Sequence, residues 1–167
     1  MGMGFLFAVP ADTVDALREL PAEKRPAYIT REIEEQYFED YPERTYELDG
    51  SWEAIHRALT GGFDFDSDSP LAPAILGGEL IYYDDASYDD YNIITAKPPL
   101  TVSAVCGELS KLGAADFKKL YDRIPADEYP DKDSDDFEDA LEHFEDSAAF
   151  WKFASDKGFW VLFAAEL

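Results

Sequence analysis

The chain has 167 residues, of which 46% are hydrophobic and 15% aromatic, so it holds enough apolar material for the core of one domain. Its 37 acidic and 14 basic residues give a formal net charge of −23 at pH 7. This charge argues against direct binding of nucleic acid or an anionic membrane, because phosphate contacts need lysine and arginine. It favours attraction to basic partners, and a salt-adapted, acidic proteome is the alternative explanation.

In chain order, the first part of the sequence predicts one strand and two helices. Residues 4–9 form an aromatic-rich apolar run, which is typical of a buried strand. A helix is expected over 12–20, with Asp12 as its cap. Apolar residues at helical spacing predict a second helix over 27–40, which Pro42 ends.

The best-marked stretch is LDGSWEAIHRALTGG, residues 48–62. One helical stripe of this stretch carries Trp52, Ile55, His56 and Leu59. Either Asp49 or Ser51 is expected to cap the start of the helix through its side-chain oxygen. Gly61 is expected to adopt the left-handed conformation that ends it.

The rest of the chain predicts further helices and three strands. We expect short helix 69–76, strands 80–83 and 92–95, helices 101–112 and 114–124, a helix through the acid-rich stretch 127–146 to Trp151, and strand 159–164. The closing strand is apolar throughout, which indicates a strand that is central or covered on both sides. Together the elements predict one α+β domain over residues 1–167, with several amphipathic helices packed on a small mixed sheet that includes the N- and C-terminal strands.

Five segments belong to one recognisable pattern: MGMGFLFAVPADTVDAL, SWEAIHRALTGG, SPLAPAILGG, PLTVSAVCGEL and FEDSAAFWKFASDKGFWVLF. Together they resemble the YfbM-like family of bacterial proteins, a domain of unknown function. The most specific parts are the stretch around Trp52 and His56 and the turn Leu76-Gly77-Gly78. The resemblance implies a single cytosolic α+β domain and no established activity, cofactor or catalytic residue. Residues 79–99 depart from the family pattern, in which a glycine-containing segment is expected.

That departing segment holds an acidic and aromatic loop, which is the candidate partner-binding surface. Tyrosine supplies contact area at protein interfaces, and carboxylates bind lysine or arginine. The candidate residues are Tyr82, Tyr83, Asp84, Asp85, Tyr88, Asp89, Asp90 and Tyr91. The alternative interpretation is a solvated hairpin tip.

His56 is a candidate general base, because imidazole titrates near neutral pH, and with Trp52 it marks a candidate small-molecule pocket. The alternative is a histidine at the edge of the core that is bonded to a backbone carbonyl, since no nucleophile or acid stands at a recognisable spacing. His143, within the acidic stretch, is expected to be solvated.

The acidic stretch also contains part of a calcium-loop pattern. Positions 1, 3, 5, 9 and 12 of a calcium loop are matched by Asp131, Asp133, Asp135, Asp139 and Glu142. Asp136 stands where the loop needs glycine, so an acidic helix start is the favoured interpretation. The lone Cys106 excludes an internal disulfide and is expected to be a buried thiol. We predict no metal site, cofactor or catalytic residue.

The start of the chain lacks the basic region of a signal peptide, and no segment approaches the ~20 apolar residues that span a bilayer. We therefore expect a cytoplasmic protein, monomeric or weakly dimeric. The leading hypothesis is a non-enzymatic acidic binding protein that engages or neutralises a basic protein partner, as an immunity protein or a nucleic-acid mimic would. The alternative is a small-molecule sensor or enzyme with its pocket near Trp52 and His56.

Overall fold

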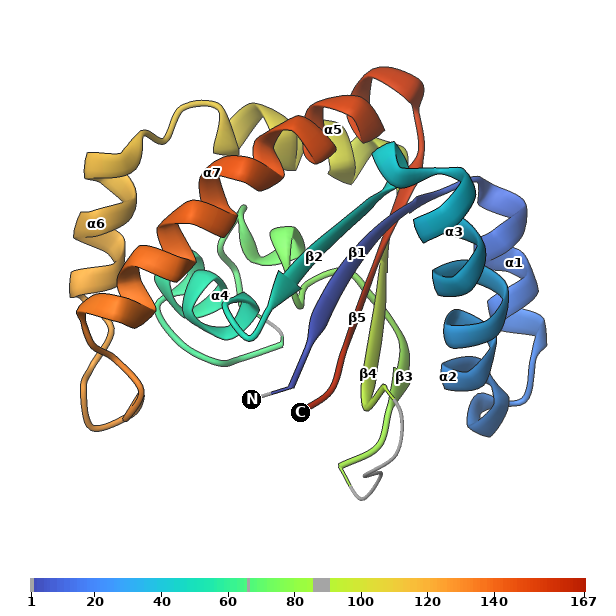
Figure 1. Cartoon of the computed structure of the whole chain (residues 1–167), viewed down its shortest axis with the longest axis horizontal. Helices are drawn as coiled ribbons and strands as arrows, with labels where there is room; N and C mark the ends of the chain where they lie inside the picture. The colour runs from blue at the N-terminus through green and yellow to red at the C-terminus, as the bar shows by residue number, and fades with distance from the viewer. Residues whose placement is uncertain (1, 66, 86–90) are drawn as a thin grey trace.

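The computed structural model describes residues 2–65, 67–85 and 91–167, and its centre is a five-stranded sheet (Figure 1). The strands are β1 (Gly4–Val9), β2 (Thr45–Asp49), β3 (Glu79–Tyr83), β4 (Ile93–Lys97) and β5 (Trp160–Ala165). Their order is β2-β1-β5-β4-β3, and all four pairings are antiparallel. The sheet is therefore antiparallel and not mixed as predicted, because every strand runs opposite to the neighbours with which it pairs.

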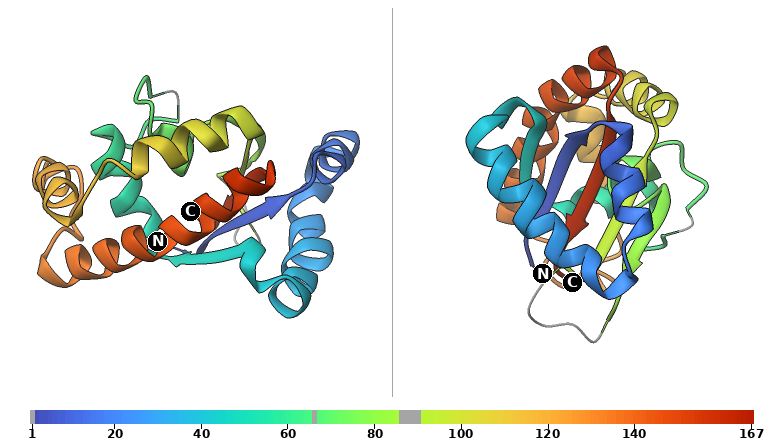
Figure 2. Two further views of the ribbon diagram at one scale, coloured as in Figure 1. Left: turned by 90° about the horizontal axis from the view of Figure 1, so that it is seen from above. Right: turned by 90° about the vertical axis from the view of Figure 1, so that its right-hand side faces the viewer.

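Helices cover both faces of this sheet (Figure 2). They are α1 (Ala11–Glu19), α2 (Arg25–Tyr28), α3 (Glu35–Asp40), α4 (Trp52–Thr60), α5 (Pro99–Leu109), α6 (Ala114–Asp122) and α7 (Ser134–Lys157). Short 3-10 turns lie at η1 (Ala22–Lys24), η3 (Pro42–Arg44) and η4 (Ala72–Ala74), and the π-helical η2 (Ile29–Glu34) joins α2 to α3. Helices α1 to α3 lie on one face, whereas α4 to α7 lie on the other (Figure 1).

The alternation of side chains along each strand produces two cores. On β5, Leu162 and Ala164 belong to the core under α1 to α3, whereas Val161 and Phe163 belong to the core under α4 to α7. All four are fully buried. The prediction of a strand that is central or covered on both sides is confirmed, because β5 is the middle strand and both of its faces are packed under helices.

The predicted α+β class and the single domain are confirmed, while several local predictions are wrong. Strand β2 was not predicted, and the expected helix over 69–76 shrinks to the single turn η4. Neither Asp12 nor Ser51 caps a helix through its side chain. Gly61 does end α4 in the left-handed conformation, with a φ of 84°.

Pairing of β1 with β5 brings the two ends of the chain side by side (Figure 1). The backbone N–H of Glu166 donates to the carbonyl of Met3 at 3.1 Å. In the part of the chain that the structure describes, no helix is long and apolar enough to cross a lipid bilayer.

Candidate functional site

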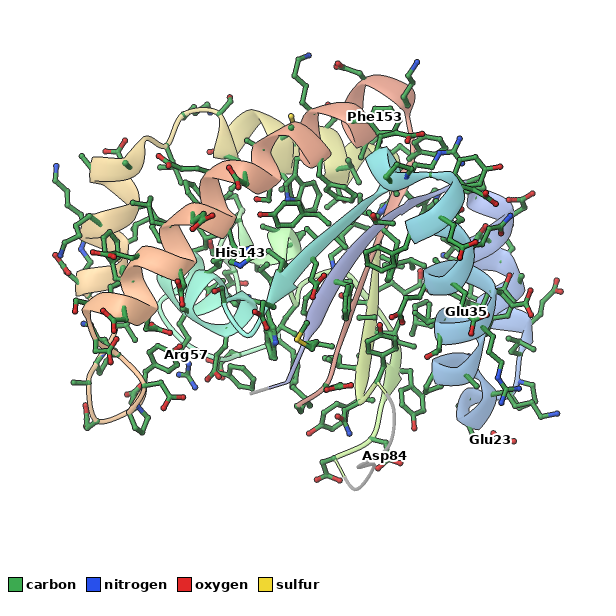
Figure 3. The ribbon with its side chains drawn as sticks, in the orientation of Figure 1. Glu23, Glu35, Arg57, Asp84, His143 and Phe153 are labelled. Carbon is green, nitrogen blue, oxygen red and sulfur yellow. The ribbon has the colours of Figure 1, made fainter. Side chains whose placement is uncertain are left out.

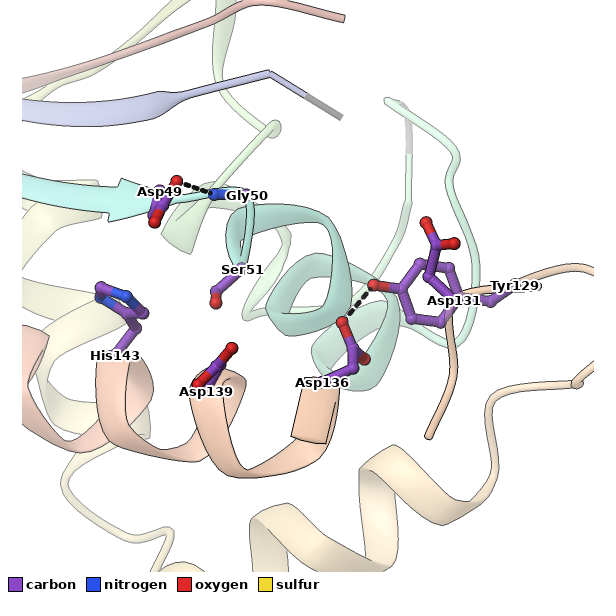
Figure 4. A pocket seen from close by; sticks show the side chains of 8 residues that line it. All are labelled: Asp49, Gly50, Ser51, Tyr129, Asp131, Asp136, Asp139 and His143. Atoms are coloured by element: carbon purple, nitrogen blue, oxygen red, sulfur yellow. Dashed lines mark hydrogen bonds between the residues drawn. The ribbon is translucent and has the colours of Figure 1, made fainter. Parts of the chain in front are cut away.

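An acidic pocket of about 370 Å³ opens between the start of α4 and the first turns of α7 (Figure 4). We call it the acidic pocket. It is lined by Asp49, Gly50, Ser51, Tyr129, Asp131, Asp136, Asp139 and His143. Three of these side chains, those of Asp136, Asp139 and His143, project from one face of α7 because they are three to four residues apart.

The opposite wall is formed where β2 turns into α4. Asp49 has a positive φ of 52°, which L-residues other than asparagine and aspartate adopt rarely. Its Oδ1 accepts a hydrogen bond of 2.9 Å from the N–H of Gly50. This local bond stabilises the sharp turn, so the exposed carboxylate of Asp49 stands at the rim of the pocket.

Two tyrosines hold the carboxylate of Asp136 in place. The hydroxyl of Tyr129 lies 2.8 Å from Asp136 Oδ1, and that of Tyr121 lies 2.5 Å from Oδ2. Burial raises the pKa of both hydroxyls, and the nearby carboxylate raises it further. The two tyrosines therefore remain neutral donors, and they leave Asp136 as a fixed negative charge in the wall.

The described side chains leave this pocket strongly negative. Four carboxylates line it and no lysine or arginine does, so His143 is its one basic group. The ion pairs between described residues all use other carboxylates. His143 is half-buried, and its Nδ1 lies 3.1 Å from the hydroxyl of Tyr46 on β2. The arrangement is suited to holding a cation.

Comparison with known proteins identifies the family. The model of a domain of unknown function, DUF1877, matches residues 1–164. The chain belongs to this family. Among solved structures, this DUF1877 chain is similar to the crystal structure of YfbM, a protein of unknown function from Escherichia coli, with a TM-score of 0.63 and 16% sequence identity. The match covers 98% of this chain and 99% of that one, and at this identity it shows the fold alone. A search of curated proteins gave no match.

The residues of the predicted partner-binding loop differ in their burial. Tyr83 and Asp85 are exposed, whereas Tyr82 and Asp84 are half-buried. The prediction that Tyr91 belongs to an exposed contact surface is wrong. Its side chain is 4% exposed, and its hydroxyl donates to Glu34 at 2.6 Å. Tyr88, Asp89 and Asp90 lie outside the described residues. Asp84 lies at the end of β3, well apart from His143 (Figure 3).

The predicted pocket residues Trp52 and His56 are both fully buried. The indole N–H of Trp52 donates to the carbonyl of Gly2 at 3.0 Å. His56 Nε2 lies 3.3 Å from the carbonyl of Asp64. This contact matches the alternative interpretation, in which the histidine is bonded to a backbone carbonyl. Burial lowers the pKa of His56 to about 4, and the positive charges of Lys97 and Arg57 act in the same direction. Neither residue lines the acidic pocket, so their role stays a prediction.

The acidic stretch of this DUF1877 chain forms a helix start and not a calcium loop. Asp133 caps α7, because its side chain accepts a 2.8 Å hydrogen bond from the N–H of Asp136. Asp135, Asp139 and Glu142 are therefore helical and cannot wrap one ion as a loop would. Within the described ranges, no group of three or more metal-ligating side chains has the geometry to hold a metal. Cys106 is half-buried in α5.

Sequence reasoning named every carboxylate of the acidic pocket without bringing them together. Asp49 is predicted as a helix cap, Asp131 and Asp139 match ligand positions of the calcium pattern, and Asp136 stands where that pattern needs glycine. It missed Tyr129 and the buried Lys97 altogether. A signal for Lys97 was present, because Ile93, Thr95 and Lys97 alternate with Ile94 and Ala96 as in a strand with two buried faces.

Proposed function

We propose that this DUF1877 protein is a non-enzymatic binding protein that engages a basic protein partner. The acidic pocket is the proposed contact site, and it accepts a lysine or arginine side chain of the partner. One observation carries the proposal: four carboxylates from three separate segments meet in one concavity that no described lysine or arginine enters.

The chemistry of the pocket favours arginine over lysine as the bound group. A guanidinium group is planar and donates in pairs to carboxylates, whereas an ammonium acts as a point charge. The carboxylates of Asp131 and Asp139 are exposed, so they are free to reorient around such a group. The net charge of −23 adds long-range attraction, which speeds association with a basic protein at low salt.

The exposed end of β3 is a second proposed contact surface for the basic partner. Tyr83 is 46% exposed and is followed in the chain by the half-buried Asp84 and the exposed Asp85. Aromatic area next to carboxylates suits a basic partner. An immunity protein that neutralises a cationic toxin, or a mimic of nucleic acid, in a bacterial cytoplasm would use surfaces of this chemistry, and we propose that class of role here.

A second candidate function concerns small molecules. It is favoured by His56, which is fully buried and whose Nδ1 has no hydrogen-bond partner among the described residues. A buried polar atom without a partner is costly, so a ligand that bonded it would be stabilised. This candidate concerns the core beside Trp52 and does not involve the acidic pocket.

The test of the primary proposal is a binding titration with a fluorescent hexa-arginine peptide, followed by anisotropy. The pocket variant combines Asp131→Asn with Asp139→Asn. Its control combines Glu23→Gln with Glu35→Gln, which removes the same charge from exposed positions on the α1–α3 side (Figure 3). Because exposed charge pairs contribute roughly 0.2–1 kcal/mol each, the pocket variant is expected to bind about 2- to 30-fold more weakly.

The control variant alters only the long-range field and no carboxylate of the pocket, so it should bind within about twofold of the wild type. Equal weakening in the two variants would show attraction by overall charge alone and would overturn the assignment to the pocket. Absence of saturable binding at low salt would overturn the basic-partner proposal itself.

A further inference from the structure

A second, smaller pocket lies at the β3 edge of the sheet, apart from the residues of the acidic pocket. Its volume is about 210 Å³, and it is lined by Phe65, Leu76, Gly78, Leu80, Tyr83 and Thr95. We call it the aromatic pocket. The rings of Phe65 and Tyr83 meet edge to face with centroids 5.5 Å apart. The lining is apolar apart from the hydroxyls of Tyr83 and Thr95.

Behind Thr95 stands Lys97, the next residue on the same face of β4. The Nζ of Lys97 donates to Thr95 Oγ1 at 2.5 Å and to the carbonyl of Ile75 at 2.6 Å. It also lies 5.4 Å from the ring centroid of Phe163. The Lys97 side chain is fully buried, so the hydroxyl of Thr95 joins a buried amine to the aromatic pocket.

This amine has no counter-charge within the described residues. The described ion pairs place Lys111, Lys118 and Lys152 against carboxylates at the surface, and they do not include Lys97. A buried ammonium without an anion is costly, because the low-dielectric interior replaces water. Burial accordingly lowers the pKa of Lys97 well below its ordinary value. An anion bound at the hydroxyl of Thr95, which accepts from this amine, would lower the cost of the buried charge.

The glycine turn next to the pocket encloses the amine tightly. Gly78 has a positive φ of 117°, and a Cβ at this position would lie 2.5 Å from the carbonyl oxygen of Ala96 and 3.3 Å from Lys97 Cγ. A Cβ on Gly77 would lie 2.7 Å from the backbone of Ala72. Because the two glycines lack a Cβ, the turn after Ile75 packs closely against the end of β4. The carbonyl of Ile75 thereby accepts the hydrogen bond from the amine of Lys97.

We propose that the aromatic pocket binds a small aromatic carboxylate, whose ring packs against Phe65, Leu80 and Tyr83. Its carboxylate accepts a hydrogen bond from the hydroxyl of Thr95, directly in front of the buried amine of Lys97. The volume supports this size of ligand, because cavities of about 150 Å³ already accept benzene. The carboxylate supplies the counter-charge that the buried amine lacks. This proposal does not rest on the basic-partner function, because the two pockets share no residue.

The test uses phenylacetate as the probe and phenylacetamide as its neutral match, titrated onto the full chain by ligand-observed NMR. Wild-type protein is expected to bind phenylacetate saturably and at least about tenfold more tightly than the amide, because one charge-assisted contact is lost in the amide. Lys97→Met should abolish this preference. A lysine with only a structural role would not change the ratio of acid to amide affinity.

Lys132→Met is the matched control, because the Nζ of Lys132 also donates two hydrogen bonds within the protein, both to backbone carbonyls, but lies outside the aromatic pocket. It should leave both affinities within about twofold. Leu80→Trp is the second variant, because Leu80 is 58% exposed and a larger side chain there would fill the pocket without disturbing the core. It should remove the binding of both probes while circular dichroism shows an unchanged fold.

Three results would overturn the proposal. The first is wild-type protein that binds no phenylacetate saturably. The second is an acid-to-amide preference that persists in Lys97→Met. Should Lys97→Met fail to fold, unchanged phenylacetate binding by a folded Leu80→Trp variant would overturn it as well.

Discussion

Tyr46 on β2 and His143 on α7 are joined by a contact of 3.1 Å between the tyrosine hydroxyl and the imidazole Nδ1, although 97 positions separate them in the chain. Their rings meet edge to face with centroids 5.9 Å apart. The contact ties the sheet edge to the helix that forms one wall of the acidic pocket. The positioning of that wall therefore depends on a long-range pair of polar side chains.

Tyr46→Phe should lower the free energy of unfolding at neutral pH by about 0.5–1.5 kcal/mol, because the hydrogen bond to His143 is lost. Burial raises the pKa of Tyr46 to about 12, and Asp146 and Glu142 add to the effect. The folded state therefore holds the hydroxyl proton of Tyr46 more tightly than the unfolded state does. The contribution of this group to stability is present below pH ~10 and is lost as the pH rises towards 12. Urea unfolding at several alkaline pH values should show that the free energy of unfolding of Tyr46→Phe falls less with rising pH than that of the wild type.

Tyr83→Phe is the control for this experiment, because Tyr83 is exposed and its hydroxyl forms none of the described hydrogen bonds. Its unfolding free energy should stay within about 0.5 kcal/mol of the wild type. Equal losses in the two variants would contradict a specific role for the Tyr46–His143 contact.

His56 should make the fold sensitive to mild acid. Its pKa falls from an ordinary 6.5 to about 4 because the imidazole is buried, so the folded state opposes its protonation. The contribution to stability is complete above pH ~6.5 and is lost as the pH falls through 4, to an extent of about 3 kcal/mol. His56→Gln should therefore lose less stability between pH 7 and pH 4 than the wild type, measured by tryptophan fluorescence during urea unfolding.

The carboxylates titrate in part of the same range, so the comparison of variants isolates the imidazole. His143→Gln supplies the matched case, because its imidazole is half-buried on α7 and not in the core. It should keep the steep acid dependence of the wild type. A His56→Gln curve that runs parallel to the wild type would refute this account.

Two glycine substitutions should have opposite signs. Gly78→Ala forces a Cβ to within 2.5 Å of the Ala96 carbonyl oxygen at a φ of 117°, so it should destabilise the fold by at least about 1–3 kcal/mol. Gly107→Ala lies within α5 with nothing within 4 Å of the new Cβ, so it should stabilise by about 0.5–1 kcal/mol. Thermal unfolding of both variants measures the difference, and a common sign would contradict it.

The ion pair between Glu53 and Arg57 should contribute more than its surface counterpart. The pair spans 2.8 Å, with 6% of the Glu53 side chain and 13% of the Arg57 side chain exposed. Arg57→Met leaves a buried carboxylate without its partner and should cost about 3–5 kcal/mol. Lys118→Met breaks an exposed pair of the same helical spacing and should cost at most about 1 kcal/mol.

Urea unfolding measures both costs. The double variant Glu53→Leu with Arg57→Met removes the unpaired charge, so it should be more stable than Arg57→Met alone. A double variant that is less stable than the single one would indicate that Arg57 acts chiefly through its packing over Phe63 and Tyr129.

Several elements were predictable because their signal is local. The periodicity of apolar residues predicted α4 and α7, and the uninterrupted apolar run of β5 predicted a central strand. The opening, helical and closing segments also carried the resemblance that the family model supports. Strand β2 escaped prediction because its residues are mostly half-buried or exposed, which gives no clear alternation.

The sequence by itself determined the charge, most of the elements and the family of this protein, since hydrophobic spacing and composition are properties of neighbouring residues. Only the tertiary structure decided that the sheet is antiparallel, that Asp49 and Asp139 line one pocket, and that the amine of Lys97 donates to the carbonyl of Ile75, 22 residues before it. These relations depend on which strands pair and which helices pack over them. They join residues far apart in the chain, and no local pattern records such distances.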